Sequence, residues 1–136
     1  MNATVKALDN IEIVGGHPAV DFVNTVHSWR ADPPPDYLFT FDDFIDWSRI
    51  SGLLPPKSAA RFKSAPGQAK AEAFAEAIKL RANLHRIFVA ISAGKAVPRN
   101  SLDHLNDVLH RTAPWRRLVA ERREGRTTIR AGWNFE

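Results

Sequence analysis

The stretch "QAKAEAFAEAIKLRANLHRIFVAISA", residues 68–93, decides the fold, because it predicts one long helix. It is rich in alanine and straight-chain residues, which favour a helix, and Gly94 stands where the helix would end. Its apolar side chains recur at helical spacing and form a single stripe, made by Ala73, Ala77, Leu80, Leu84, Ile87, Phe88 and Ile91. We therefore expect this helix to turn that stripe towards the core.

Upstream, the segment "GGHPAVDFVNTVHSW", residues 15–29, predicts a helix that begins near Pro18. Proline suits a first helical turn, where its missing N–H has no partner to lose. One side of this helix would be apolar, with Ala19, Phe22, Val23, Val26 and Trp29. The opposite side would be polar, with Asp21, Asn24, Thr25 and Ser28. An acid, an amide and a hydroxyl are unusual on one short helix. They indicate a specific role in binding or in structure.

Two more helices follow from start and stop signals. Thr40 and Asp43 resemble a capping box, and Gly52 is a natural stop, so a helix is expected between them. Another should run from Ser101, a good N-cap, to about Arg111. Its buried side would consist of Leu102, Leu105, Val108 and Leu109. The prolines of 31–37 exclude regular structure there, and the connector at 53–64 has room for one short helix.

Two regions predict strands. "IEIV" at 11–14 is a β-branched run, and "WRRLVAERREGRTTIRAGW" at 115–133 reads as two strands around Glu124 and Gly125. Because a lone hairpin is marginally stable, we expect it to pair with the 11–14 strand. The predicted fold is thus α+β, with about four helices packed on a small antiparallel sheet. Residues 1–10 would be a mobile lead-in and residues 11–136 one domain.

Composition narrows the function. The chain has 136 residues, 44% of them hydrophobic and 25% charged, which suits a globular domain. It contains no cysteine, which excludes disulfides and thiolate zinc sites within these residues and fits a reducing cytoplasm. No apolar run is long enough for a membrane span. The histidines lack the i,i+4 spacing of a metal site, and no phosphate loop or nucleophile elbow is present, so we expect no metal, no cofactor and no enzymatic activity.

Charge is uneven along the chain. Residues 1–65 hold 6 Lys and Arg against 8 Asp and Glu, whereas residues 66–136 hold 13 against 7. The candidates for a nucleic-acid contact are Arg116, Arg117, Arg122 and Arg123. A solvated basic end is the favoured interpretation, because no nucleic-acid motif accompanies these arginines.

Arg81 lies at the edge of the apolar stripe, where a charge needs a partner. Asp21 has the right chemistry, and we expect the two to meet, with Asn24 and Thr25 adding hydrogen-bonding groups. Asn106 is a further candidate on the later helix. Two interpretations remain open. These residues line a pocket for a small polar or anionic ligand, or they only lock the first helix to the long helix.

Several stretches resemble the ABATE domain, the N-terminal half of the CGNR zinc-finger proteins, described as stress-induced transcription regulators. The matching stretches are "GGHPAVDFVNT" at 15–25, "DYL" at 36–38, "FDDFIDWSRISGLL" at 41–54, "AIKLRANLHRIFVAISAGKAVP" at 77–98 and "LDHLNDVL" at 102–109. The resemblance implies a sensory, ligand-binding domain of such a regulator. Asp21, Phe22, Asn24, Thr25 and Arg81 belong to its recognisable signature.

The zinc finger of that family carries cysteines that this chain lacks. DNA binding, which the family assigns to the finger, is therefore expected only through such a finger. A protein-interaction or homodimerisation module without a ligand is the alternative function.

Overall fold

The computed structural model describes the backbone of residues 8–133, without the side chains of residues 9, 117, 119, 121, 123, 128 and 130–133. Five α-helices dominate this part: α1 (Pro18–Val23), α2 (Phe41–Ile50), α3 (Pro56–Lys63), α4 (Gly67–Ser92) and α5 (Arg99–Thr112). A 3-10 turn, η1 (Leu8–Asn10), precedes them, and another, η2 (Ala113–Trp115), leads into strands β1 (Arg116–Arg123) and β2 (Arg126–Trp133). None of the helices in this part could cross a membrane.

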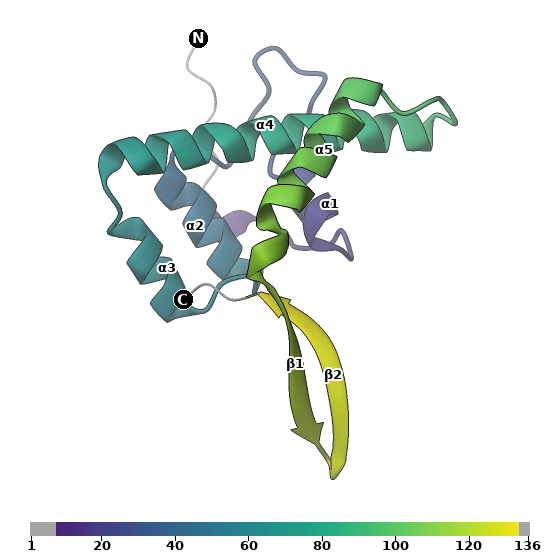
Figure 1. The fold of residues 1–136 in the computed structure, drawn as a ribbon. Helices are drawn as coiled ribbons and strands as arrows, with labels where there is room; N and C mark the ends of the chain where they lie inside the picture. Colours follow the sequence, from purple (N-terminus) through teal and green to yellow (C-terminus); the bar gives the residue numbers. More distant parts are fainter. Residues whose placement is uncertain (1–7, 134–136) are drawn as a thin grey trace.

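The long helix α4 is the axis of the domain, as its sequence predicts. In Figure 1 it runs across the molecule, with α1 and α2 on one side of it, α3 beyond α2, and α5 crossing it. The core lies between α1, α2 and the middle of α4, where Phe22, Val23, Leu38, Trp47 and Leu84 pack together. Burial of such apolar side chains stabilises the fold by about 1.5–3 kcal/mol each.

The α+β prediction is wrong, because the molecule is mostly helical and its helices do not pack on a sheet. Residues 11–14 form no strand, and Ile13 and Val14 are exposed. The only pairing described for β1 and β2 is with each other, through an antiparallel hairpin that projects away from the helices (Figure 1). A short β-branched run becomes a strand only beside a free strand edge, and the projecting hairpin offers none near residues 11–14.

The hairpin itself is confirmed, with its turn at Glu124 and Gly125. The capping box of α2 is confirmed too: Thr40 Oγ1 accepts from the N–H of Asp43, and the Asp43 carboxylate accepts from the N–H of Thr40. Both features depend on residues close together in the chain, which is why the sequence predicts them well.

The ends of the other helices differ from prediction. Helix α1 stops at Val23 because Thr25 Oγ1 donates to the carbonyl of Phe22 and the chain then turns into an extended segment. Helix α5 begins at Arg99, after Pro98, so Ser101 is a buried helical residue and not an N-cap. Of the side chains predicted to be buried on this helix, Leu102 and Leu109 are exposed, while Leu105 packs against the core.

A glycine is required at position 15, because the side chains of Val20 and Asp21 come close to its backbone. Its N–H donates to Asp21 Oδ1 at 2.7 Å, and a Cβ at this position would lie 2.7 Å from the same oxygen and 2.8 Å from Val20 Cγ1.

We expect Gly15→Ala to lower the free energy of unfolding by about 1–3 kcal/mol through overpacking, measured by urea denaturation. Gly67→Ala is the control, since no atom lies within 4 Å of its added Cβ. Equal stabilities of the two variants would contradict this explanation.

Candidate functional site

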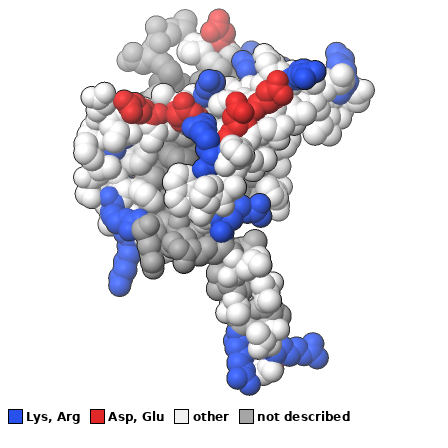
Figure 2. All heavy atoms as spheres, viewed as in Figure 1, with Lys and Arg blue, Asp and Glu red and all other residues white. Residues whose placement is uncertain are grey.

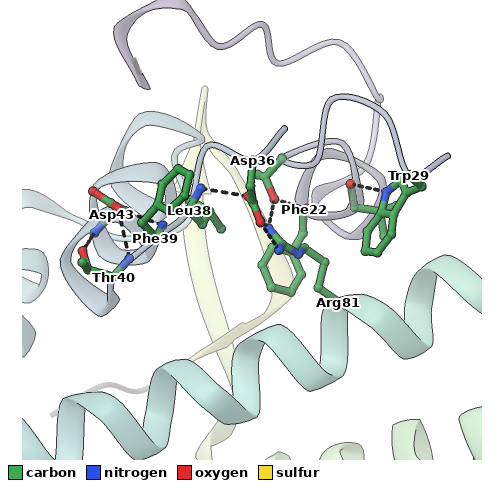
Figure 3. Close-up of polar contacts among 10 residues, drawn as sticks. Phe22, Trp29, Asp36, Leu38, Phe39, Thr40, Asp43 and Arg81 are labelled. Atoms are coloured by element: carbon green, nitrogen blue, oxygen red, sulfur yellow. Dashed lines mark hydrogen bonds and ion pairs between the residues drawn. The ribbon is translucent and has the colours of Figure 1, made fainter. Parts of the chain in front are cut away.

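Arg81 is the centre of a buried polar network. Its side chain, 5% exposed, leaves the middle of α4 and forms a two-pronged ion pair with Asp36 (Figure 3). The guanidinium donates to Asp36 Oδ1 at 2.9 Å and to Asp36 Oδ2 at 2.5 Å, and it also donates to Thr25 Oγ1 at 2.8 Å. Two parallel N–H···O bonds orient a carboxylate more firmly than a single contact would.

The carboxylate is positioned by the backbone around it. An isolated antiparallel bridge joins Val26 to Asp36, and the N–H of Tyr37 donates to the carbonyl of Thr25 at 3.0 Å. Asp36 Oδ1 also accepts from the N–H of Leu38 at 2.9 Å (Figure 3). The proline-rich loop therefore returns beside the segment that follows α1, and Asp36 reaches α4 from that loop.

Trp29 covers another side of the network. Its indole N–H donates to the carbonyl of Val23 at 3.1 Å (Figure 3), and its ring stacks on His85 with centroids 4.0 Å apart and planes at 7°. The Arg81 guanidinium carbon lies 5.8 Å from the Trp29 ring centroid, within the range of a cation–π contact. Arg81 is thus held by a carboxylate, a hydroxyl and an aromatic face.

The expected partner of Arg81 was Asp21, and the structure gives that role to Asp36. Asp21 is buried, but its carboxylate accepts from the N–H of Gly15. Thr25 joins the network, whereas Asn24 is exposed at the end of α1 and Asn106 is exposed on α5. The predicted candidates therefore do not converge on one pocket.

Sequence reasoning missed Asp36, although it lies in the quoted "DYL" stretch. Its only signal was a carboxylate beside the three prolines of an otherwise irregular loop. The network ties this loop and the end of α1 to α4, which is the locking role of the second interpretation but through Asp36 in place of Asp21. Arg81 Nε is buried and has no hydrogen-bond partner among the described residues.

The pKa of His85 is lowered from its ordinary value of 6.5, first by burial and second by the charge of Arg86. The folded protein therefore binds a proton at His85 less readily than the unfolded chain does. We expect the free energy of unfolding to fall as the pH is lowered through 6.5 towards the lowered pKa, and to lose this dependence in His85→Gln. NMR titration of the ring protons gives the pKa directly. A midpoint at or above 6.5 would contradict the assignment.

A surface groove lies between α4 and α5. It consists of two adjoining hollows of about 460 and about 360 Å³, and Lys79, His104 and Asp107 line both. The larger hollow is also lined by Ala82, Asn83, Arg86, Asn100 and Asp103. Figure 2 shows acidic and basic side chains interspersed over these two helices.

Several groups in the groove lack an ion pair or, for one histidine nitrogen, a hydrogen bond. Lys79, Arg86 and Asp107 form no ion pair with any residue that the structure describes. His104 Nε2 is buried and has no hydrogen-bond partner within the described residues. Asn83, which is 7% exposed, donates to the carbonyl of Lys79 and accepts from Arg86. In the larger hollow the cations come from α4 and the carboxylates from α5, whereas the smaller hollow is also lined by Glu76 of α4 and Arg111 of α5.

The arginines predicted to contact nucleic acid lie on β1, and Arg116 and Arg122 are exposed there. The side chains of Arg117 and Arg123 lie outside the described part. The same hairpin carries exposed apolar side chains, since Leu118 is 79% and Ile129 70% exposed. Among the described residues, no three metal-ligating side chains come together in one place.

These features define a class of protein: a small helical domain, locked around a buried arginine–carboxylate pair, with a polar groove and a projecting hairpin. The chain belongs to the ABATE family, whose model matches residues 16–134 and carries the description "Putative stress-induced transcription regulator". This confirms the resemblance found in the sequence. No curated protein and no solved structure is significantly similar to the chain.

Proposed function

We propose that this domain is the sensory part of a transcription regulator and that the groove between α4 and α5 binds its ligand. The observation that carries the proposal is the pair of unneutralised charges in the groove: Arg86 on α4 and Asp107 on α5. The larger hollow of the groove, with about 460 Å³, is also within the size range of small-molecule sites, which is about 300–1,000 Å³.

The ligand class follows from the two sides of the larger hollow. A small molecule with a carboxylate and an ammonium group, such as an amino acid, would meet Arg86 or Lys79 with one end and Asp107 with the other. A guanidinium binds a carboxylate through two parallel hydrogen bonds, which favours a ligand that ends in that group. His104 Nε2 supplies one further polar contact inside the groove.

Arg81 is not proposed as the ligand anchor. Its guanidinium already binds Asp36 and Thr25, so an anion would have to displace a buried carboxylate. The groove takes the place of the pocket expected around Asp21 and Arg81.

Thermal unfolding in the presence of amino acids, dicarboxylates and diamines tests the proposal. A ligand at 100 times its Kd stabilises the folded state by about 2.7 kcal/mol. We expect zwitterions to stabilise the wild type, and Arg86→Ala and Asp107→Ala to abolish the effect. Arg49→Ala, an exposed arginine of α2, is the matched control and should retain it. If no compound stabilises the protein, or if the stabilisation survives both groove variants, the proposal is wrong.

A second candidate function is assembly, and the hairpin favours it. A two-stranded hairpin is marginally stable alone, and Leu118 and Ile129 form an apolar patch on it that a second copy of the chain would cover. We expect a concentration-dependent dimer in sedimentation experiments, lost in Leu118→Ser and Ile129→Ser. The exposed Ile91→Ser on α4 is the control. A wild type that stays monomeric at high concentration would refute assembly.

A further inference from the structure

The hairpin carries the whole net charge of the chain. Residues 116–133 contain six arginines and two glutamates, a net charge of +4, which equals the formal net charge of all 136 residues. The remaining residues hold equal numbers of basic and acidic side chains. A positive charge concentrated on one projecting element, with a neutral body behind it, attracts an anionic partner to that element.

Two of the three arginines whose side chains are described on the hairpin lie near its free end. Arg122 and Arg126 flank the turn on the two strands and are exposed. Figure 2 shows basic side chains gathered at the tip of the hairpin. Glu124 and Gly125 form a tight two-residue turn, with φ values of 52° and 76°. Positive φ at both residues is typical of a type I′ turn, whose backbone twist matches that of the flanking strands. The tip of the hairpin is therefore narrow.

The dimensions of the hairpin suit one kind of anionic polymer. Each strand has eight residues, which at about 3.4 Å per residue gives a ribbon of about 27 Å. The major groove of B-form DNA is about 12 Å wide and admits a two-stranded β-ribbon. The major groove of double-stranded RNA is too deep and narrow for this.

We propose that the β1–β2 hairpin inserts its tip into the major groove of duplex DNA, with Arg122 and Arg126 on the phosphates that border the groove. This goes beyond the ligand-binding function and does not depend on it. It places a DNA contact in this domain itself, in addition to any contact made through a zinc finger elsewhere. Such phosphate contacts position a protein on DNA without reading its sequence.

A second copy of the chain is a less suitable binding partner for the tip than duplex DNA is. Pairing two tips would bring Arg122 and Arg126 of one copy against the same arginines of the other, and like charges at close range repel. The exposed apolar patch of Leu118 and Ile129 lies nearer the helices than the turn does.

Fluorescence anisotropy of a short labelled DNA duplex, titrated with the full chain at several salt concentrations, tests the proposal. We expect binding that weakens with salt. Arg122→Ala and Arg126→Ala should each reduce the slope of log K against log salt by about 0.9, the value for one lost phosphate contact. Arg122→Lys should keep the slope, and Glu124→Gln should tighten binding, because it removes a negative charge from the tip.

Arg99→Ala is the matched control: Arg99 is an exposed arginine on α5, 93% accessible at its side chain. It should bind DNA as the wild type does, and circular dichroism should show that all variants are folded. The proposal is overturned if the wild type does not bind DNA at low salt, or if the two tip variants behave like Arg99→Ala. It is equally overturned if an RNA duplex binds as tightly as DNA, or if the tip variants change the mass in solution and leave DNA affinity unchanged.

Discussion

Replacing Arg81 by alanine is expected to lower the free energy of unfolding by about 3–5 kcal/mol, the usual cost of removing one partner of a buried ion pair. The substitution leaves the Asp36 carboxylate, 20% exposed, without its counter-charge. It also removes the donor to Thr25, which is fully buried. Small domains have about 5–15 kcal/mol of stability in total, so this variant should be near its unfolding threshold. Urea denaturation followed by circular dichroism measures the loss.

Two further variants make the test specific to burial. Lys63→Met breaks the Lys63–Asp46 ion pair, whose side chains are 35% and 31% exposed, and should cost under about 1 kcal/mol. The double variant Arg81→Met with Asp36→Leu should recover part of the loss, because it leaves no uncompensated charge inside the protein. An Arg81→Ala variant that loses no more stability than Lys63→Met would show that the network contributes little.

Replacing Trp47 by alanine is expected to cost about 3–5 kcal/mol, because it opens a cavity in the core. The side chain is 2% exposed and lies against Phe22 and Phe44, with ring centroids 5.2 and 6.2 Å away. Such aromatic contacts add to the stabilisation that burial alone provides. Equilibrium denaturation of the purified variant measures the change.

Trp47→Phe distinguishes the loss of the aromatic ring from the loss of the indole N–H. It keeps an aromatic ring in the cluster and removes an indole N–H that has no acceptor among the described residues, so its cost should be much smaller than that of alanine. Trp115→Ala is the control, since Trp115 is 55% exposed. Similar losses for Trp47→Ala and Trp115→Ala would contradict the place of Trp47 in the core.

The parts of the fold that the sequence predicted correctly depend on neighbours in the chain. The middle of the α4 stripe needs only the helical period, although its two ends, Ala73 and Ile91, are exposed. The cap of α2 needs only Thr40 and Asp43. The hairpin needs two β-favouring runs around Glu124 and Gly125. The predicted sheet was wrong, because pairing of residues 11–14 required a distant strand edge that the projecting hairpin does not supply.

In the candidate site, too, the sequence predicted what depends on nearby residues and missed what depends on distant ones. The sequence identified Arg81 as a charge that needs a partner, since it lies at the edge of an apolar stripe. It predicted Asp21 as the partner and missed Asp36. Both are carboxylates that precede α4 in the chain, and nothing local to either shows which one reaches Arg81. The groove between α4 and α5 was not predicted at all, because its lining comes from two helices whose crossing only packing determines.

By itself, therefore, the sequence of this ABATE domain determined the positions of the main helices and of the hairpin, and the need to neutralise Arg81. Only the tertiary structure decided that the neutralising carboxylate is Asp36, 45 residues away in the chain, and that the hairpin projects from the helices, with Arg122 and Arg126 exposed at its tip. The reason is physical. Helical periods, caps and turns act over a few residues, whereas an ion pair depends on the distance between groups that only the folded chain brings together.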